Sequence, residues 1–130
     1  MEKLISQIKP KKILEIGSYE GASTCYLIEK LAKENPIEIH CIDAWSIEMG
    51  EESDYKHYGS NIDMSAVESR FRQNTKTAIE KSPKQVSLTI YKEFSDVQLS
   101  KLLSSGKKNY FDFIYIDGSH LGPDVLAMLF

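Results

Sequence analysis

The residues with the clearest chemical potential form a glycine loop near the start of the chain. An apolar run containing one acid, Glu15, leads into Gly17 and Ser18, and Gly21 precedes a helical pattern. Gly17 can turn sharply off the end of a strand, and Gly21 lets the next helix approach that strand, because neither residue carries a Cβ. A strand, a glycine loop and a helix in this order are typical of a small-molecule binding site. The alternative is that both glycines only form a turn.

The spacing of the glycines separates two kinds of ligand. A dinucleotide-binding loop has the pattern G-x-G-x-x-G, and its middle glycine makes room for the pyrophosphate. Here the pattern is G-x-x-x-G, and Tyr19 stands where that middle glycine would be. The loop therefore disfavours a pyrophosphate ligand and, with it, a dinucleotide-dependent oxidoreductase.

Polar residues also follow the other predicted strands. Asp43 directly follows the second strand, Ser95 lies a few residues beyond the third, and Asp117 follows the fourth. In a parallel sheet these positions share one edge, so we expect them to converge with the glycine loop on one cleft. The carboxylate of Asp43 has two acceptor oxygens at a separation that suits the vicinal hydroxyls of a ribose. Alternatively, Asp43 caps a turn and Ser95 caps a helix.

His120, three residues after Asp117, is a candidate general base because histidine titrates near neutral pH. The structural alternative is that residues 117–120 form a loop whose Asp and Ser side chains bond to backbone groups. His40 and His57 have no partners at a spacing typical of a metal site. They are not candidates.

The elements that must position these residues alternate between helix and strand. Apolar residues recur at helical spacing in four segments, and four apolar runs have the composition of buried strands. The helices are predicted over 2–9, 21–34, 65–81 and 95–105, and the strands over 12–16, 37–42, 86–91 and 111–116. This order predicts a single α/β domain over residues 1–130, with a doubly wound parallel sheet and helices on both faces.

The last two helices carry further signals. Capping boxes, in which a Ser is followed three residues later by Glu or Gln, predict that these helices begin at Ser65 and Ser95. In the last helix Leu99, Leu102 and Leu103 are expected to face the core.

A polar segment from Trp45 to Asn61 follows the second strand. Long segments without periodicity are usually functional loops in compact domains, so we expect this one to be able to close over a ligand. Trp45, at its start, could stack on a base or pack in the core.

Composition narrows the classes of function. The 130 residues are 42% hydrophobic and 27% charged, with a net charge of −3. This composition suits one soluble domain and argues against nucleic acid or an anionic membrane as the main partner. There is no membrane-span pattern or signal-peptide pattern, so we expect a cytoplasmic location. Cys25 and Cys41 lie in a predicted helix and a predicted strand, which suits buried free thiols.

Four segments, distributed along most of the chain, match the motifs of a known family in the same order. They are ILEIGSYEGAS, CIDAW, the stretch from Met49 to Asn74, and FDFIYIDGSH. Through them the chain resembles the class I S-adenosylmethionine-dependent methyltransferases, especially the small-molecule O-methyltransferases with catechol-methyltransferase-like or cephalosporin-hydroxylase-like sequences. The resemblance implies a Rossmann-like sheet with strand order 3-2-1-4 for the strands present.

The resemblance also implies roles for individual residues. The cofactor-binding residues would be Glu15, Gly17, Ser18, Gly21, Asp43, Ala44, Trp45, Ser95 and Asp117. Gly17 and Ser18 would offer backbone groups to the methionine portion of S-adenosylmethionine, and Asp43 would hold its ribose. The residues bordering the adenine would be Ala44, Trp45 and Ser95.

For the reaction, the resemblance places Asp117 at the reacting end of the cofactor. In metal-dependent members, an acid at this position is one ligand of a magnesium ion that also binds the acceptor hydroxyl. The other ligands follow a fifth strand that this sequence does not contain. An oxygen of a small hydroxylated or sugar-like acceptor would displace the sulfonium methyl group, and either His120 or metal binding would account for the acceptor's proton.

The end of the sequence is apolar from Val125 to Phe130, and the fourth strand would be a sheet edge without strands five to seven. We therefore expect an N-terminal, cofactor-binding part of a longer methyltransferase, or a chain that forms homo-oligomers through this edge and its apolar end. A second class of function remains open: a non-catalytic adenosine- or nucleotide-binding module completed by self-association.

Overall fold

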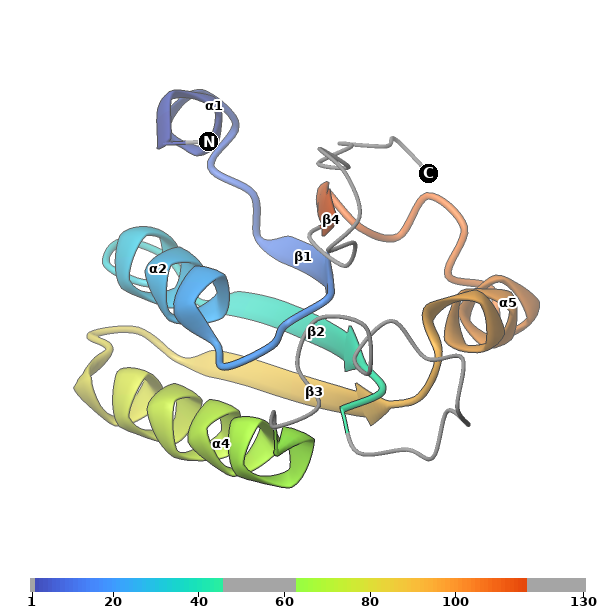
Figure 1. Cartoon of the computed structure of the whole chain (residues 1–130). Helices are drawn as coiled ribbons and strands as arrows, with labels where there is room; N and C mark the ends of the chain where they lie inside the picture. The colour runs from blue at the N-terminus through green and yellow to red at the C-terminus, as the bar shows by residue number, and fades with distance from the viewer. Residues whose placement is uncertain (1, 46–62, 117–130) are drawn as a thin grey trace.

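The computed structural model describes residues 2–45 and 63–116 of the chain (Figure 1). The helices are α1 (Glu2–Ile8), α2 (Ala22–Leu31), α4 (Met64–Lys81) and α5 (Ser95–Ser104), and the strands are β1 (Lys12–Ile16), β2 (Ile37–Asp43), β3 (Val86–Lys92) and β4 (Phe113–Ile116). The alternation predicted from the sequence is confirmed. None of the helices in these ranges is long and apolar enough to cross a membrane.

The strands form one sheet in the order β3-β2-β1-β4, and every neighbouring pair is parallel. β1 lies inside the sheet, where Ile13 is opposite Ile39 of β2 and Leu14 is opposite Ile114 of β4. This is the predicted Rossmann-like α/β fold with its predicted strand order. The carboxyl ends of β1, β2 and β4 consequently lie at the same edge of the sheet.

Helices cover both faces of the sheet (Figure 1). On one face, α1, α2 and α4 pack against Ile13 and Ile39, and on the other, α5 packs against Leu14 and Ile42. Successive side chains of β1 therefore enter two different cores. A strand buried on both faces needs a nearly continuous apolar sequence, and this marks the single acid, Glu15, as an exception that requires its own account.

The predicted start of α5 at Ser95 is confirmed, but α4 begins at Met64, one residue before the predicted Ser65, and neither serine caps its helix. The cap of α4 is Asp63, whose Oδ1 accepts hydrogen bonds from the backbone N–H groups of Ser65 and Ala66 at 3.0 and 3.3 Å. Phe94 caps α5 without a side-chain hydrogen bond. Asp is as good a capping residue as Ser, so the S-x-x-E pattern did not identify the residue that caps α4.

The buried face of α5 also differs from the prediction at one position. Leu102 is 5% exposed and Leu99 packs beside it, but Leu103 is 45% exposed. Adjacent residues in a helix point about 100° apart, so Leu102 and Leu103 cannot both face the sheet.

β4 is shorter than the predicted strand because Asp112 has another role. Its Oδ2 accepts hydrogen bonds from the backbone N–H groups of Lys11 and Lys12 at 3.0 and 3.1 Å. Phe111, before it, is buried in the core on the α5 side. The carboxylate thus ties the start of β1 to the segment that enters β4.

Candidate functional site

The glycine loop leaves β1 between the carboxyl ends of its two neighbours. Gly17 has φ 86° and donates its N–H to the carbonyl of Ile42 at 2.8 Å, while Gly21 has φ 94° and donates to the carbonyl of Ser18 at 2.9 Å. Both φ values lie in the left-handed region, where residues with a Cβ are strained. The turn-forming role of the two glycines is therefore real, and it also sets the shape of the candidate site.

Glu15 lies beneath this loop and is fully buried. Its Oε1 accepts a hydrogen bond from the hydroxyl of Thr24 in α2 and a longer one, at 3.8 Å, from the thiol of Cys41 in β2. Burial and then the nearby charge of Glu15 raise the pKa of the Cys41 thiol well above its usual range. The carboxylate is part of the core beneath the loop, where hydrogen bonds offset the cost of burying it.

Ser18 is 3% exposed, and its hydroxyl has no hydrogen-bond partner among the described residues. The Ser18 side chain acts to lower the pKa of the Cys41 thiol, against the larger effect of burial, but a thiol is only a weak hydrogen-bond partner. Buried hydroxyls are normally bonded to protein, water or ligand. A molecule bound at the loop could therefore supply a hydrogen-bond partner for the Ser18 hydroxyl.

Asp43 ends β2 beside the loop and is 6% exposed. Its Oδ2 accepts the backbone N–H of Tyr19 at 2.9 Å, and its Oδ1 accepts the backbone N–H of Trp45 at 2.8 Å. The second bond is the turn-capping contact that the sequence left open as an alternative, and the first joins β2 to the glycine loop. Ribose hydroxyls would have to use acceptor positions of the carboxylate that these two amides do not occupy.

Trp45 points into the protein. Its side chain is 1% exposed, and the centroid of its ring lies 4.9 Å from that of the Phe71 ring. Its indole N–H donates to the carbonyl of Tyr19 at 2.8 Å. The packing interpretation describes this arrangement, since the ring presents no open face for stacking. Ala44, 8% exposed, lies between Asp43 and Trp45 in the same turn.

Ser95 is exposed at the first position of α5. The end of β3 lies next to that of β2, because Glu93 donates its backbone N–H to the carbonyl of Asp43 at 3.1 Å. The structure therefore brings the ends of β1, β2 and β3 together. Ser95 is two residues beyond this contact.

Asp117, His120 and nearly all of the segment from Trp45 to Asn61 lie outside the described residues. β4 ends at Ile116, which is opposite Ile16, so β4 finishes at the level of the glycine loop. Within the described ranges no group of three or more His, Cys, Asp and Glu side chains could hold a metal ion. The magnesium site stays a prediction that depends on Asp117.

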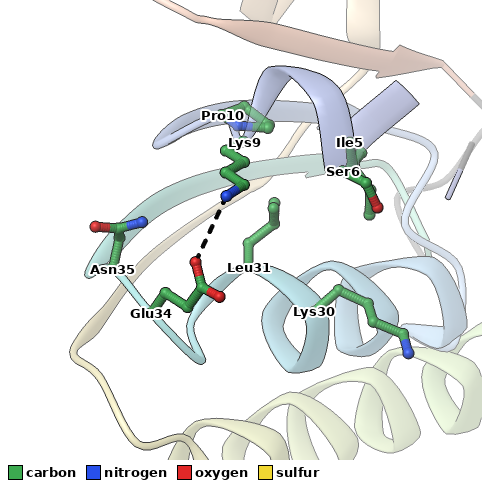
Figure 2. A pocket seen from close by; sticks show the side chains of 8 residues that line it. All are labelled: Ile5, Ser6, Lys9, Pro10, Lys30, Leu31, Glu34 and Asn35. Carbon is green, nitrogen blue, oxygen red and sulfur yellow. Dashed lines mark ion pairs between the residues drawn. The ribbon is translucent and has the colours of Figure 1, made fainter. Parts of the chain in front are cut away.

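A hollow elsewhere in the molecule is separate from this site. About 170 Å³ of space lies between α1 and the end of α2, where Lys9 and Glu34 form an ion pair at 3.8 Å (Figure 2). The side chains of this pair are 63% and 73% exposed, so the pair contributes little to stability. The hollow is at the opposite end of the sheet from the glycine loop, where ligands of such sheets do not bind.

Two residues at the site were not singled out from the sequence. The backbone N–H of Tyr19 donates to Asp43, and its carbonyl accepts from the indole of Trp45. The sequence indicated only that Tyr19 stands where a dinucleotide-binding loop has its middle glycine. Thr24 is buried on the core face of α2 together with Leu27, Ile28 and Leu31. A threonine at helical spacing with these apolar residues indicates a hydroxyl that forms a hydrogen bond inside the core.

The fold is a Rossmann-like α/β domain whose candidate site lies at the carboxyl ends of its strands. Comparison with protein-family models identifies the family: a model described as a methyltransferase domain matches residues 14–130. The chain belongs to this methyltransferase family, and membership implies S-adenosylmethionine as the methyl donor. A search of the curated proteins found no match.

Proposed function

We propose that the chain forms the cofactor-binding part of an O-methyltransferase that transfers a methyl group from S-adenosylmethionine to a hydroxyl of a small-molecule or sugar-like acceptor. The observation that carries the proposal is the hydrogen bond between the Asp43 carboxylate and the Tyr19 amide. This bond holds the acid at the end of β2 against the glycine loop that follows β1, in a chain that belongs to a methyltransferase family.

In this proposal the cofactor lies along the carboxyl ends of β1, β2 and β3. The methionine portion lies at Gly17 and Ser18, where the buried hydroxyl of Ser18 gains a partner. The ribose lies at Asp43, and the adenine lies near Ala44 and Ser95, with Trp45 supporting that wall from inside the protein.

Bound S-adenosylmethionine supplies a methyl group activated by the sulfonium. The chain's own residues orient it and exclude water, which accounts for a large part of the acceleration in reactions of this type. The acceptor oxygen would form the new bond to the methyl carbon as the carbon–sulfur bond breaks, and S-adenosylhomocysteine would leave. Asp117 is the proposed residue at the reacting end of the cofactor, and His120 is proposed to take the acceptor's proton, with magnesium at Asp117 as the alternative route.

A second proposal is a non-catalytic adenosine- or nucleotide-binding module that completes its core by self-association. β4 is an edge of the described sheet, and an apolar edge strand can pair with another chain. In either case we propose a cytoplasmic protein whose partner is a small molecule and not nucleic acid or membrane.

Calorimetric titration with S-adenosylmethionine, S-adenosylhomocysteine, ATP and NAD tests these proposals. We expect the two sulfur compounds to bind, and binding of NAD alone would reverse the assignment. Methyl transfer is then assayed with catechols and sugars, with and without magnesium. Binding of adenosine compounds without transfer to any acceptor would favour the binding module.

A further inference from the structure

Two residues with side chains at the site hold the left-handed backbone conformation that usually requires glycine. Tyr19, in the glycine loop, has φ 52°, and Trp45, after β2, has φ 43°. A left-handed conformation at a residue with a large side chain costs free energy, and it persists only where the surroundings enforce it. Contacts around Tyr19 and Trp45 must therefore hold each residue in this conformation.

The constraint is reciprocal between the two residues. The indole N–H of Trp45 donates to the carbonyl of Tyr19 at 2.8 Å, and Oδ2 of Asp43 accepts the N–H of Tyr19 at 2.9 Å. The second oxygen of Asp43 accepts the N–H of Trp45 at 2.8 Å. Both backbone polar groups of Tyr19 are thus held by the turn at the end of β2, and the same carboxylate holds that turn.

The indole ring is itself fixed by packing. It is 1% exposed and lies against Phe71 of α4, which is fully buried. The N–H therefore points at the Tyr19 carbonyl without freedom to rotate away. A buried, correctly aimed donor on a rigid ring can hold a strained loop more firmly than a flexible side chain can.

We infer that Trp45 is a positioning residue for the glycine loop: its indole N–H, together with Asp43, holds Tyr19 in the conformation in which the loop receives the cofactor. The inference rests on the proposed function of the loop and adds a role for Trp45 other than stacking on adenine. It predicts that the indole N–H matters for ligand affinity beyond the contribution of the ring to the core.

Two variants separate these contributions. Trp45→Phe keeps an aromatic ring facing Phe71 but removes the N–H donor, whereas Phe71→Leu loosens the packing of the same ring and keeps the donor. We expect Trp45→Phe to weaken binding of S-adenosylhomocysteine about tenfold, the factor typical of one lost hydrogen bond. We expect Phe71→Leu also to lower the free energy of unfolding, because it leaves a void beside the indole ring, yet to change affinity less than about twofold.

Hydrogen exchange in the ligand-free chain provides a readout that does not depend on the cofactor. The Tyr19 amide should exchange about tenfold faster in Trp45→Phe than in the wild type, and should stay protected in Phe71→Leu. Trp45 is the only tryptophan in the sequence, so one indole cross-peak in the NMR spectrum reports its N–H, and we expect that proton to be protected from solvent.

Unchanged Tyr19 exchange and unchanged affinity in Trp45→Phe would overturn the inference. So would losses of affinity in both variants that simply follow their losses of stability. If the wild type does not bind S-adenosylhomocysteine, the proposed function fails, while Tyr19 exchange still decides whether the indole holds the loop.

Discussion

Gly21 lies directly against Phe71. A Cβ built on Gly21 would be 3.1 Å from Cδ1 of Phe71 and 3.6 Å from Cγ2 of Thr75. Phe71 is fully buried between this glycine and the ring of Trp45, so it has little room to move aside. The glycine thus sets the distance at which α2 and α4 pack beside the loop.

Gly21→Ala should lower the free energy of unfolding by about 2–4 kcal/mol, because it adds crowding to the cost of a left-handed φ. Gly106→Ala is the matched control, since Gly106 has a similar φ of 86° but a Cβ added there would meet nothing within 4 Å. We expect about 1 kcal/mol for the control. Urea denaturation measures both, and equal losses would show that Phe71 yields without cost.

The sheet could be predicted from the sequence because strands buried on both faces must be almost entirely apolar. Ile13, Leu14 and Ile16 are apolar for that reason, and the same holds for Ile39 and Ile42. Helix ends were less predictable. Asp63 and Ser65 are both good caps, and only the backbone conformation decides which one is used.

The candidate site was predictable in its strand-end residues but not in their contacts. Asp43 could be placed beside the glycine loop, because parallel strands end at one edge. The bonds from Asp43 and Trp45 to the Tyr19 backbone depend on a left-handed φ at a tyrosine, which no local pattern indicates. Trp45 likewise suits stacking or packing, and only the position of Phe71 distinguishes them.

A second prediction concerns pH and Glu38, on the α5 face of the sheet. Its Oε2 accepts hydrogen bonds from the hydroxyl of Tyr110 and from Nε2 of His40, both at 2.6 Å. Burial raises the pKa of Glu38, but these two hydrogen bonds and the charges of His40 and Lys12 outweigh it and leave the pKa below its ordinary value.

A lowered pKa in the folded state means that ionised Glu38 stabilises the fold above the pKa of an unfolded glutamate, roughly 4.3. This contribution is lost as the pH falls through the folded pKa. Glu38→Gln should therefore cost roughly 1 kcal/mol at pH 7, and its deficit relative to the wild type should shrink below about pH 4.

Glu34→Gln is the control for this measurement, because the Glu34 side chain is 73% exposed and pairs only loosely with Lys9. It should change stability little at any pH. Urea denaturation at several pH values gives the comparison. A deficit in Glu38→Gln that stays constant with pH would contradict the role of the ionised carboxylate.

A third prediction tests how Glu15 is accommodated in the core. Thr24→Val replaces the hydroxyl that donates to Glu15 with a methyl group of similar size, leaving the buried carboxylate with one donor fewer. We expect a loss of about 2–3 kcal/mol in the free energy of unfolding. Thr24→Ser keeps the hydroxyl and removes only a methyl group, so it should cost about 1 kcal/mol. If the serine variant were as unstable as the valine variant, the bond to Glu15 would not be what stabilises this part of the core.

The last prediction separates ligand binding from backbone support at Asp43. Asp43→Ala removes the acceptor of two backbone amides beside the glycine loop, and Asp112→Ala removes the acceptor of two backbone amides at the opposite end of the sheet. Both variants should be less stable, and Asp43→Ala more so because Asp43 is buried and Asp112 is exposed.

Affinity for S-adenosylhomocysteine should distinguish the two variants. If Asp43 holds the ribose hydroxyls, calorimetry should show a loss of about 1–3 kcal/mol in binding free energy for Asp43→Ala. Asp112→Ala should bind the compound as the wild type does, because its carboxylate supports β1 at the end away from the loop. Wild-type affinity in Asp43→Ala would remove the ribose assignment and leave Asp43 as a residue that only shapes the loop. Equal weakening in the two variants would mean that affinity follows the stability of the sheet and not a contact to the ligand.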